Sequence, residues 1–585
     1  MQNPRRPLSL RPRVLLTSVF GPYGSDDDFG SRRLNPMELY QNQVTRVQGP
    51  FSLRMFHRSW GIMMIQANIE ASTNLLDFPT LERFEREIAD NRYDVIGITG
   101  IQPNIGKVAA MCERIRLAQP EATIVVGGHV ANAPDVERRL DADHIVRGDG
   151  IRWFRRFLGE PEDRPVRHPL IFSGIGARAM GISLSERPGE VAATLIPSVG
   201  CPMGCNFCAT SAMFGGKGRH IDFYETGDEL YDLMTQMERQ MQVRSFFIMD
   251  ENFLLHRKRA LRLLELMERG GKAWALYVFS SANVLGKYTI EELVGLGVSW
   301  VWMGLEGEDA PYAKLKGTDT RSLVRRLQSH GIRVLGSSII GMESHDLDNI
   351  DRVIDHAVSH ETDFHQFMLY TPVSGTPLHR EHQANGTLLS TEGQEHDIHG
   401  QLRFNFTHPR LPPGAETELL VRAFERDFET NGPSVVRLAS TLLAGWRRYK
   451  DHPEPRIRER YRWETRDLGK GYAGAVWAAE RWFRARGNST LADRIGRLGR
   501  EIASEFGLKA RILAPLAGRY VLAALGREDR RLRNGWTYEP PTFYETNVGA
   551  EQGGPFLRHP AAGHCRWVET APPMPSRVAA RAALA

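Results

Sequence analysis

Over the first 150 residues, short apolar runs alternate with stretches that carry apolar residues every three or four positions. The runs predict buried strands and the stretches predict helices. Because strands alternating with helices indicate βαβ units around a parallel sheet, residues 1–165 are predicted to form a Rossmann-like α/β domain. The predicted strands are 13–20, 61–67, 94–99, 122–127 and 144–147, and the predicted helices are 79–90, 105–118 and 135–140.

A second alternating series follows over residues 191–385. Its six strand–helix units are enough for an open, partial (β/α)6 TIM barrel, whose functional groups would lie at the carboxyl ends of the strands. The predicted strands are 192–197, 245–249, 274–280, 300–305, 334–341 and 363–370, and the predicted helices are 225–241, 258–270, 289–296, 320–331 and 347–360. Residues 166–190, which contain several prolines and glycines, are predicted to be a linker.

The last third of the chain has mainly helical periodicity. We expect a C-terminal α-helical domain over residues 386–548 and a loose tail over 549–585, which is rich in glycine and proline. The predicted helices of this domain are 433–446, 474–486, 490–506 and 509–525.

Composition is ordinary for a multidomain globular protein of 585 residues, with 41% hydrophobic and 25% charged residues. The five cysteines form no paired framework, which favours a reducing compartment and a cytoplasmic location. No run of 18 apolar residues and no signal-peptide pattern occurs, so we expect no membrane span.

The net charge of +5 is unevenly distributed. Residues 433–535 contain 23 Lys and Arg against 11 Asp and Glu, a local excess of 12 positive charges. An arginine-rich solvated face over an apolar core explains this excess, and so does attraction to an anionic membrane surface, a phosphorylated substrate or a partner. No recognised nucleic-acid-binding motif is present, and we expect no nucleic acid partner.

The most specific chemical pattern is the C-x3-C-x2-C spacing of Cys201, Cys205 and Cys208, directly after the predicted strand 192–197. Thiolates are suited to iron–sulfur clusters, and three of them on a [4Fe–4S] cluster leave one iron open for a small molecule. A structural zinc with His220 as the fourth ligand is the alternative. The two other cysteines, Cys112 and Cys565, are too few for a second cluster.

This motif, with the aromatic Phe207 before its last cysteine, resembles the radical S-adenosylmethionine (SAM) superfamily over roughly residues 190–385. The resemblance implies that the open iron chelates the amino and carboxylate groups of SAM. It also implies that one electron, from a donor such as flavodoxin or ferredoxin, cleaves SAM to a 5′-deoxyadenosyl radical.

The resemblance and the polar residues at the strand ends together give the candidate SAM-binding residues. Acidic groups after the second strand can accept hydrogen bonds from the SAM ammonium, small donors suit its ribose or carboxylate, and an aromatic ring can cover adenine or the cluster. Ordinary polarity at a barrel rim is the alternative for each of them. The candidates are Phe207, Arg219, Asp250, Glu251, Ser280 and Glu306.

The N-terminal domain resembles the cobalamin-binding domain of the B12-dependent radical SAM branch, with Thr99-Gly100-Ile101 in place of its Ser-x-Leu and Gly127-Gly128 as its Gly-Gly. The D-x-H-x-x-G motif is absent, since the turn after the first strand reads GPYGSDDD over residues 21–28, so cobalt would lack that histidine ligand. A degenerate domain that binds nothing is the alternative. The candidate cobalamin-binding residues are Thr99, Gln102, Asn104, Gly127, Gly128 and Gly148.

Together the resemblances imply a B12-dependent radical SAM methyltransferase that acts on an unactivated carbon or phosphorus centre. The alternatives are ring closure, oxidation or rearrangement without methyl transfer, a radical SAM enzyme without cobalamin, and a non-catalytic cluster-binding protein. The substrate is expected to be a small molecule, namely a lipid, a tetrapyrrole or a natural-product intermediate. Peripheral contact with a membrane through the basic C-terminal helices is a further expectation.

Overall fold

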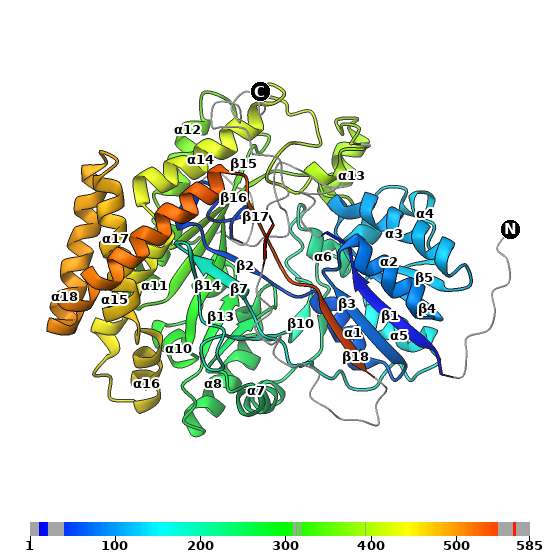
Figure 1. Ribbon diagram of the computed structural model, residues 1–585, viewed down its shortest axis with the longest axis horizontal. Coiled ribbons are helices and arrows are strands. Elements are labelled where there is room, and N and C mark those ends of the chain that lie inside the picture. Colours follow the sequence, from blue (N-terminus) through cyan, green and yellow to red (C-terminus); the bar gives the residue numbers. More distant parts are fainter. Residues whose placement is uncertain are drawn as a thin grey trace.

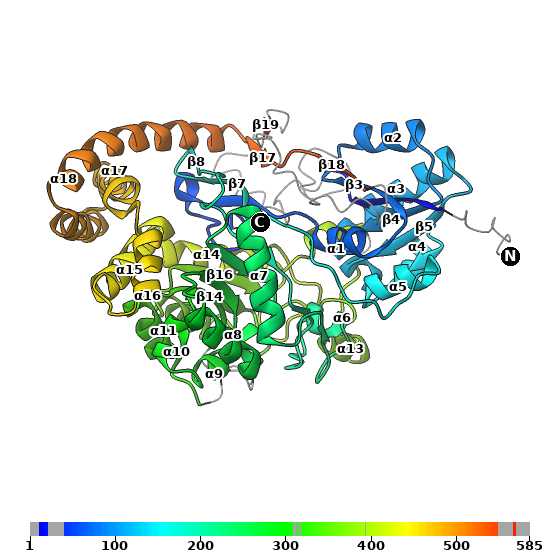
Figure 2. The same ribbon diagram turned by 90° about the horizontal axis from the view of Figure 1, so that it is seen from below.

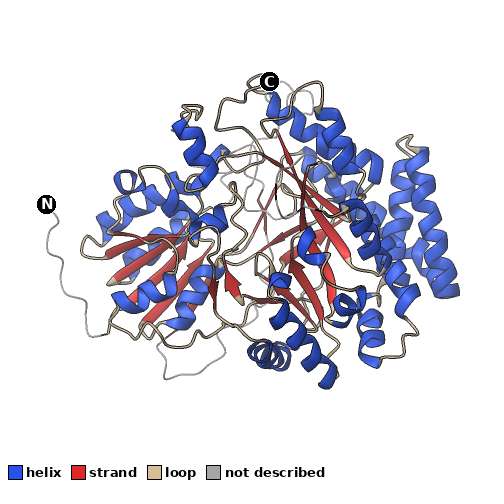
Figure 3. Ribbon diagram, turned by 180° about the vertical axis from the view of Figure 1, so that it is seen from behind, coloured by secondary structure: helices blue, strands red, loops and turns tan. Residues whose placement is uncertain are grey.

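Two six-stranded sheets organise the protein. The computed structural model describes residues 11–21, 40–307, 312, 315, 317–391, 393–547 and 566–568. In Figure 1 the first sheet and its helices (blue and cyan) lie beside the second sheet (green), and the later helices (yellow and orange) cover the far side of the second sheet. Figure 3 shows the strands of the two sheets as separate groups.

The first sheet has the strand order β18-β3-β1-β4-β5-β6, in which β3, β1, β4, β5 and β6 are parallel. Helices cover both faces of this sheet. Successive side chains of a strand point to opposite faces, so Leu15 packs with α2, α3 and α4 on one face, and Leu16 packs with α1 and α5 on the other. The elements are β1 (Arg13–Ser18), α1 (Trp60–Asn68), β3 (Ser72–Asp77), α2 (Leu81–Asp90), β4 (Val95–Thr99), α3 (Ile105–Ala118), β5 (Thr123–Gly127), α4 (Val136–Arg139), β6 (His144–Ile145) and α5 (Gly150–Phe157).

The predicted strand 61–67 is wrong, since this segment lies inside helix α1. Its run of isoleucine and methionine is apolar on nearly all sides, so it shows no period that distinguishes a helix from a strand, and methionine, alanine and glutamine favour a helix. Asp77 on the following strand, β3, fixes the start of α1. Its carboxylate accepts hydrogen bonds from the backbone amide and the hydroxyl of Ser59 at 3.0 and 2.7 Å.

The second sheet has the order β16-β15-β14-β13-β12-β9, with all neighbouring strands parallel. All six predicted strands and all five predicted helices of this region are present, with ends shifted by a few residues. The strands are β9 (Ala193–Leu195), β12 (Ser245–Ile248), β13 (Ala275–Phe279), β14 (Val298–Glu306), β15 (Arg333–Ile340) and β16 (Phe364–Leu369). The helices are α7 (Gly227–Met241), α8 (Arg257–Arg269), α10 (Ile290–Gly295), α11 (Thr320–Ser329) and α12 (Ile350–Val358).

The segment predicted as a linker contains regular structure. Its strands β7 (Ile175–Ala179) and β8 (Ile182–Ser183) form a three-stranded antiparallel sheet with β2 (Arg54–Phe56). Arg178 of β7 is buried and pairs at 2.8 Å with Glu528, far along the chain. Long-range contacts of this kind order a segment whose prolines and glycines alone indicate a flexible connection.

Among the described residues, six α-helices follow the second sheet: α13 (Pro377–Ala384), α14 (Ala415–Asn431), α15 (Ser434–Tyr449), α16 (Pro455–Glu464), α17 (Ala473–Arg484) and α18 (Ser489–Arg533). The two helices predicted over 490–506 and 509–525 are the halves of α18, which bends at Gly507, where φ is +69°. Figure 2 shows α18 along the outer edge of the molecule. No described helix has the length and apolarity that crossing a bilayer requires.

The chain finally returns to the first sheet. Strand β18 (Phe543–Asn547) pairs antiparallel with β3, and β17 (Thr537–Glu539) pairs with β19 (Arg566–Val568). Buried Arg58 joins the returning strand to the sheet, because its guanidinium contacts Asp77 at 2.9 Å and Glu545 at 2.8 Å. Apart from β19, the predicted loose tail 549–585 lies outside the described residues, and so does Cys565.

Candidate active site

The three motif cysteines lie on the loop between β10 (Ser198–Val199) and the short helix α6 (Ala209–Met213). Cys208 caps this helix, since its sulfur accepts a hydrogen bond from the amide of Ser211 at 3.4 Å. The Ser211 hydroxyl donates to the carbonyl of Cys201 at 2.7 Å and so closes the loop. Gly204 has φ +64°, and a β-carbon there would lie 2.6 Å from the Cα of Lys217, so the loop requires glycine at this position.

The spacing of the sulfur atoms favours a cluster over a single zinc ion. A tetrahedral zinc with 2.3 Å bonds holds its sulfurs about 3.8 Å apart, whereas each thiolate of a [4Fe–4S] cluster binds a different iron and the sulfurs are further apart. The sulfurs of Cys201, Cys205 and Cys208 do not all lie within 4.8 Å of one another. His220 is engaged elsewhere, because its Nε2 contacts Asp222 at 2.8 Å.

Glu251 presents an unsatisfied buried oxygen beside the cysteine loop. Burial raises the pKa of its carboxyl to about 7, although the amides of Glu251 and Gly200 donate hydrogen bonds to it. Its Oε2 is buried and has no hydrogen-bond partner among the described residues. A buried carboxylate oxygen without a donor is costly, and an ammonium group would satisfy it through a charge-assisted hydrogen bond. The residues present therefore fit the amino group of SAM.

Asp250, the acidic neighbour of Glu251, is fully engaged within the protein. One of its oxygens accepts hydrogen bonds from the Ser198 hydroxyl at 2.7 Å and from the guanidinium of Arg259, and the other accepts from the amide of Asn252 at 3.0 Å. Arg259 also contacts Asp222, on β11 (Ile221–Asp222), at 3.4 Å. Asp250 thus connects the start of the cysteine loop to helix α8, and Glu251 is the acid with a free oxygen.

Replacing Arg259 by methionine is expected to destabilise the protein by about 3–5 kcal/mol, because Asp250 would remain buried without its counter-ion. Arg262 on the same helix is the matched control. Its side chain is 37% exposed and pairs with exposed Asp228, so Arg262→Met should cost about 0–1 kcal/mol. Thermal unfolding of both variants measures the difference, and equal shifts in Tm would contradict a structural role for the Arg259–Asp250 pair.

The remaining SAM candidates lie in different surroundings. Ser280 follows β13 and donates to the Oδ1 of Asn252 at 3.1 Å, and Glu306 ends β14 with 4% exposure and φ +54°. Phe207 packs edge-on against Tyr312, with ring centroids 5.0 Å apart. Arg219 is exposed, and its side chain lies against Gly215. Phe207 is partly buried on the cysteine loop, and the acidic and serine candidates lie at carboxyl ends of second-sheet strands, whereas Arg219 lies at the surface.

The cobalamin candidates gather at the carboxyl edge of the first sheet. Thr99 ends β4, Gly127 ends β5 and Gly148 follows β6. Gln102 and Asn104 form the 3-10 turn that leads into α3, where Asn104 is buried. A β-carbon at Gly128, where φ is +82°, would lie 2.7 Å from both the Gly100 carbonyl oxygen and the Thr99 hydroxyl. The structure therefore brings all six candidates to one edge, where the close contacts require glycine at position 128.

This edge faces the cysteine loop. A β-carbon on Gly148 would lie 3.9 Å from the carbonyl oxygen of Met213, the last residue of α6. The Gln102 side chain donates to the carbonyl of Ser374, on the loop after β16, at 3.1 Å. Next to it, a β-carbon on Gly375 would lie 3.2 Å from the Cβ of Asn132. The carboxyl edges of the two sheets thus meet, as a reaction shared between two cofactors requires.

Alanine at Gly128 is expected to reduce cobalamin binding at least tenfold, because its methyl group would collide with the backbone of Gly100 and displace the edge of the sheet. Gly159 is the matched control, since it has φ +74° but no atom within 4 Å of a built β-carbon. The cobalt content of each purified variant gives the measurement. Equal cobalt content in both variants would show that the close approach at Gly128 does not matter for the cofactor.

Sequence reasoning missed several groups at this site. His129 follows Gly128 at the start of a 3-10 turn, and burial lowers the pKa of its imidazole. Ser198 and Arg259 hold Asp250 through the hydrogen bonds described above. For His129 the adjacent Gly-Gly was an available indication. Ser198 and Arg259 act through tertiary contacts that no local pattern shows. The turn at residues 22–28 lies outside the described residues.

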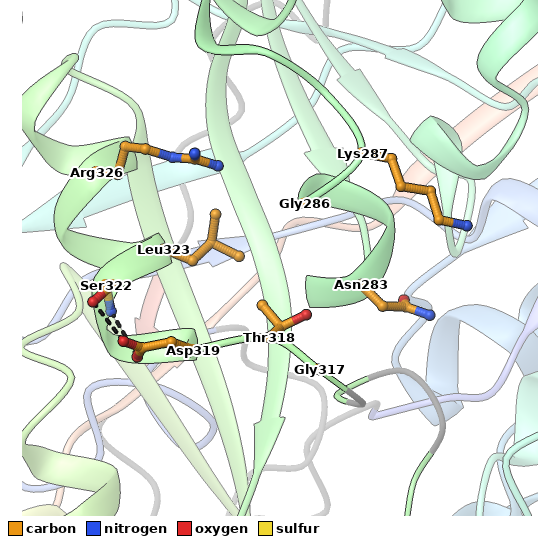
Figure 4. Close-up of a pocket in the computed structure, with 9 residues that line it drawn as sticks. All are labelled: Asn283, Gly286, Lys287, Gly317, Thr318, Asp319, Ser322, Leu323 and Arg326. Carbon is orange, nitrogen blue, oxygen red and sulfur yellow. Dashed lines mark hydrogen bonds between the residues drawn. The ribbon is translucent and has the colours of Figure 1, made fainter.

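A cavity of 580 Å3 opens between α9 (Ala282–Leu285) and α11. Figure 4 shows Arg326, Lys287 and Asn283 around it, with Asp319 capping α11 through Ser322. None of the predicted cofactor-binding residues lines this cavity. Its lining residue Asn283 accepts a hydrogen bond from the Ser281 hydroxyl at 2.8 Å, next to Ser280.

Two family models match the chain. The model described as B12 binding domain matches residues 52–158, and the model described as Radical SAM superfamily matches residues 195–357. The first match runs from β2 to α5, and the second from the end of β9 into α12. The chain thus has an α/β fold with a Rossmann-like B12-binding domain and a radical SAM domain. The predicted cofactors, which are cobalamin, a [4Fe–4S] cluster and SAM, are confirmed by these two domain types.

Several curated proteins are similar to this chain. An uncharacterised methyltransferase of Pyrococcus horikoshii is 23% identical over 51% of this chain and 71% of its own length. Bacteriochlorophyllide d C-12(1)-methyltransferase of Chlorobaculum tepidum is 28% identical over 49% of this chain and 66% of its length. Hopanoid C-2 methylase of Rhodopseudomonas palustris is 22% identical over 58% and 64%. The chain spans about two thirds of the length of these relatives.

Solved structures of the radical S-adenosylmethionine methyltransferase TsrM from Kitasatospora setae are also similar. The structure with cobalamin and a [4Fe–4S] cluster has a TM-score of 0.42 at 16% identity and covers 64% of this chain and 75% of that one. The structure with tryptophan and a SAM analogue has a TM-score of 0.46 at 15% identity and covers 78% and 99%.

Proposed function

We propose that this chain, which joins a B12-binding domain to a radical SAM domain, is an enzyme that transfers a methyl group to an unactivated carbon or phosphorus centre of a small molecule. One observation supports this above all: the cysteine loop and α6 lie against the carboxyl edge of the first sheet, next to Gly148. Cobalamin bound at that edge and a cluster bound by the cysteines would therefore act on one substrate that lies between them.

The chain's own residues would hold and orient the cofactors. Cys201, Cys205 and Cys208 would bind three irons of the cluster, and the free oxygen of Glu251 would accept a hydrogen bond from the SAM ammonium. Gly127 and Gly128 would let cobalamin approach the backbone closely. When bound, the cluster and SAM supply radical hydrogen abstraction, and cobalamin supplies a transferable methyl group.

The proposal includes the finer architecture. We take the six parallel strands of the second sheet as a partial (β/α)6 barrel, and we keep the domain division at residues 165, 190, 385 and 548. In this division the helices α14 to α18 form a C-terminal domain that contributes to substrate choice. The names of the relatives include bacteriochlorophyllides and a hopanoid. They support a tetrapyrrole or a lipid as the substrate, and a natural-product intermediate stays a further candidate. Flavodoxin or ferredoxin as the electron donor is part of the proposal.

The test is incubation of the anaerobically reconstituted enzyme with methyl-labelled SAM, cobalamin and a reductant, in extracts of the host with and without the gene. We expect 5′-deoxyadenosine, S-adenosylhomocysteine and one labelled product that is absent without the enzyme. 5′-Deoxyadenosine without label in any product would indicate ring closure, oxidation or rearrangement. Absence of both nucleoside products would indicate a non-catalytic cluster-binding protein.

A further inference from the structure

The second half of α18 presents an exposed apolar stripe. Leu508, Ile512, Leu516 and Tyr520 are 71%, 53%, 58% and 61% exposed. They recur every fourth residue, so they follow one side of the helix over about 120° of its circumference. Isolated exposed apolar residues are ordinary, whereas a continuous row of four indicates an interaction surface. We call these four side chains the α18 stripe.

Basic side chains surround the α18 stripe, and acidic ones are absent from this stretch of sequence. Residues 507–527 contain Lys509, Arg511, Arg519 and Arg527 and no aspartate or glutamate. All four are exposed, and none forms an ion pair with another described residue. The first half of α18 differs, because Glu501 and Glu505 there pair with Arg447 and Lys450 of α15 and its C-cap.

We propose that the α18 stripe and its basic neighbours form a docking surface for an anionic lipid bilayer. The helix would lie in the plane of the membrane surface, with the apolar row among the acyl chains and the cations at the lipid headgroups. Helix α18 runs along the outer edge of the molecule (Figure 2), and the exposure of the four side chains leaves the α18 stripe accessible to a flat surface. This inference goes beyond the proposed function and does not depend on it.

Charge distinguishes the bilayer from two other occupants. A second copy of the chain would bring the same four cations against each other. The C-terminal residues 549–585 contain four Lys and Arg and two Asp and Glu, so this segment is itself positively charged. An anionic membrane surface complements the basic face, and each cation near it strengthens binding about fivefold.

The test is co-sedimentation of the full-length protein with vesicles of phosphatidylcholine, with and without phosphatidylglycerol. We expect binding to the anionic vesicles, at least tenfold weaker binding to the neutral ones, and weakening by salt. The variant Ile512→Asp/Leu516→Asp should lose at least tenfold in affinity. Lys509→Gln/Arg511→Gln/Arg519→Gln should lose about a hundredfold on anionic vesicles only.

Leu117→Asp is the matched control, because this leucine is 86% exposed on α3 and lies outside the stripe. It should bind vesicles like the unmodified protein, and circular dichroism verifies that each variant is folded. The proposal is overturned by lack of vesicle binding, by equal binding to both lipid mixtures, or by an equal loss in the Leu117 variant. It is also overturned if the stripe variant abolishes a dimer in light scattering and leaves vesicle binding unchanged.

Discussion

Alanine at Cys201, Cys205 and Cys208 together is expected to remove all cluster iron and all formation of 5′-deoxyadenosine. The three thiols are the only cysteines on the loop, and Cys112 is buried in another domain. Without them no soft ligand remains to hold iron at this place. Iron analysis of reconstituted protein and nucleoside analysis after reduction with dithionite give the measurement. The loss of activity should exceed a thousandfold.

Cys112→Ala is the control for the cysteine variant. Cys112 lies in the core of the first domain on α3, and burial raises the pKa of its thiol to about 12, which keeps it protonated and unreactive. This variant should keep its full iron content and activity, with a modest loss of stability. Iron retained by the triple variant, or lost equally by the Cys112 variant, would refute the assignment of the cluster to the loop.

Glu251→Gln is expected to weaken SAM binding about 10- to 100-fold without changing the iron content. Glutamine keeps the shape of the side chain but loses the charge that would attract the SAM ammonium. A hydrogen bond to a charged group contributes about 1.5–3 kcal/mol. Equilibrium binding of SAM to the reconstituted, unreduced enzyme gives the measurement.

Glu225→Gln is the control for Glu251→Gln, because Glu225 is exposed on the segment that leads into α7. It should leave SAM affinity unchanged. An unchanged affinity in the Glu251 variant would show that another group holds the ammonium. A loss of iron in that variant would instead mean that Glu251 shapes the cysteine loop.

Much of the fold could be predicted from hydrophobic periodicity, because buried parallel strands such as 94–99 and 334–341 are short apolar runs between helices. The prediction failed at 61–67, where the run is apolar on nearly all sides and carries no period. It also missed several strands that tertiary partners stabilise, among them β3, β7, β8 and β18: β3 pairs with β1, β7 with β2, and β18 with β3.

For the candidate site, too, local sequence features could be predicted and tertiary contacts could not. The cysteine spacing and the Gly-Gly at 127–128 are local features, and a sequence shows them directly. The sequence does not show which of the two neighbouring acids, Asp250 or Glu251, has a carboxylate oxygen without a partner. Ser198 and Arg259, which lie on other elements of the fold than Asp250, donate hydrogen bonds to it. The exposure of Arg219 likewise depends on the path of the loop around it.

The return of β18 to the first sheet has a mechanical consequence. A domain attached by one segment can swing, but here the chain enters the first sheet at β1 and comes back to its edge at β18, where Arg58 joins Asp77 to Glu545. Each further attachment of this kind restricts rotation of the first sheet relative to the rest of the molecule. The two facing carboxyl edges are therefore expected to keep a fixed orientation relative to each other.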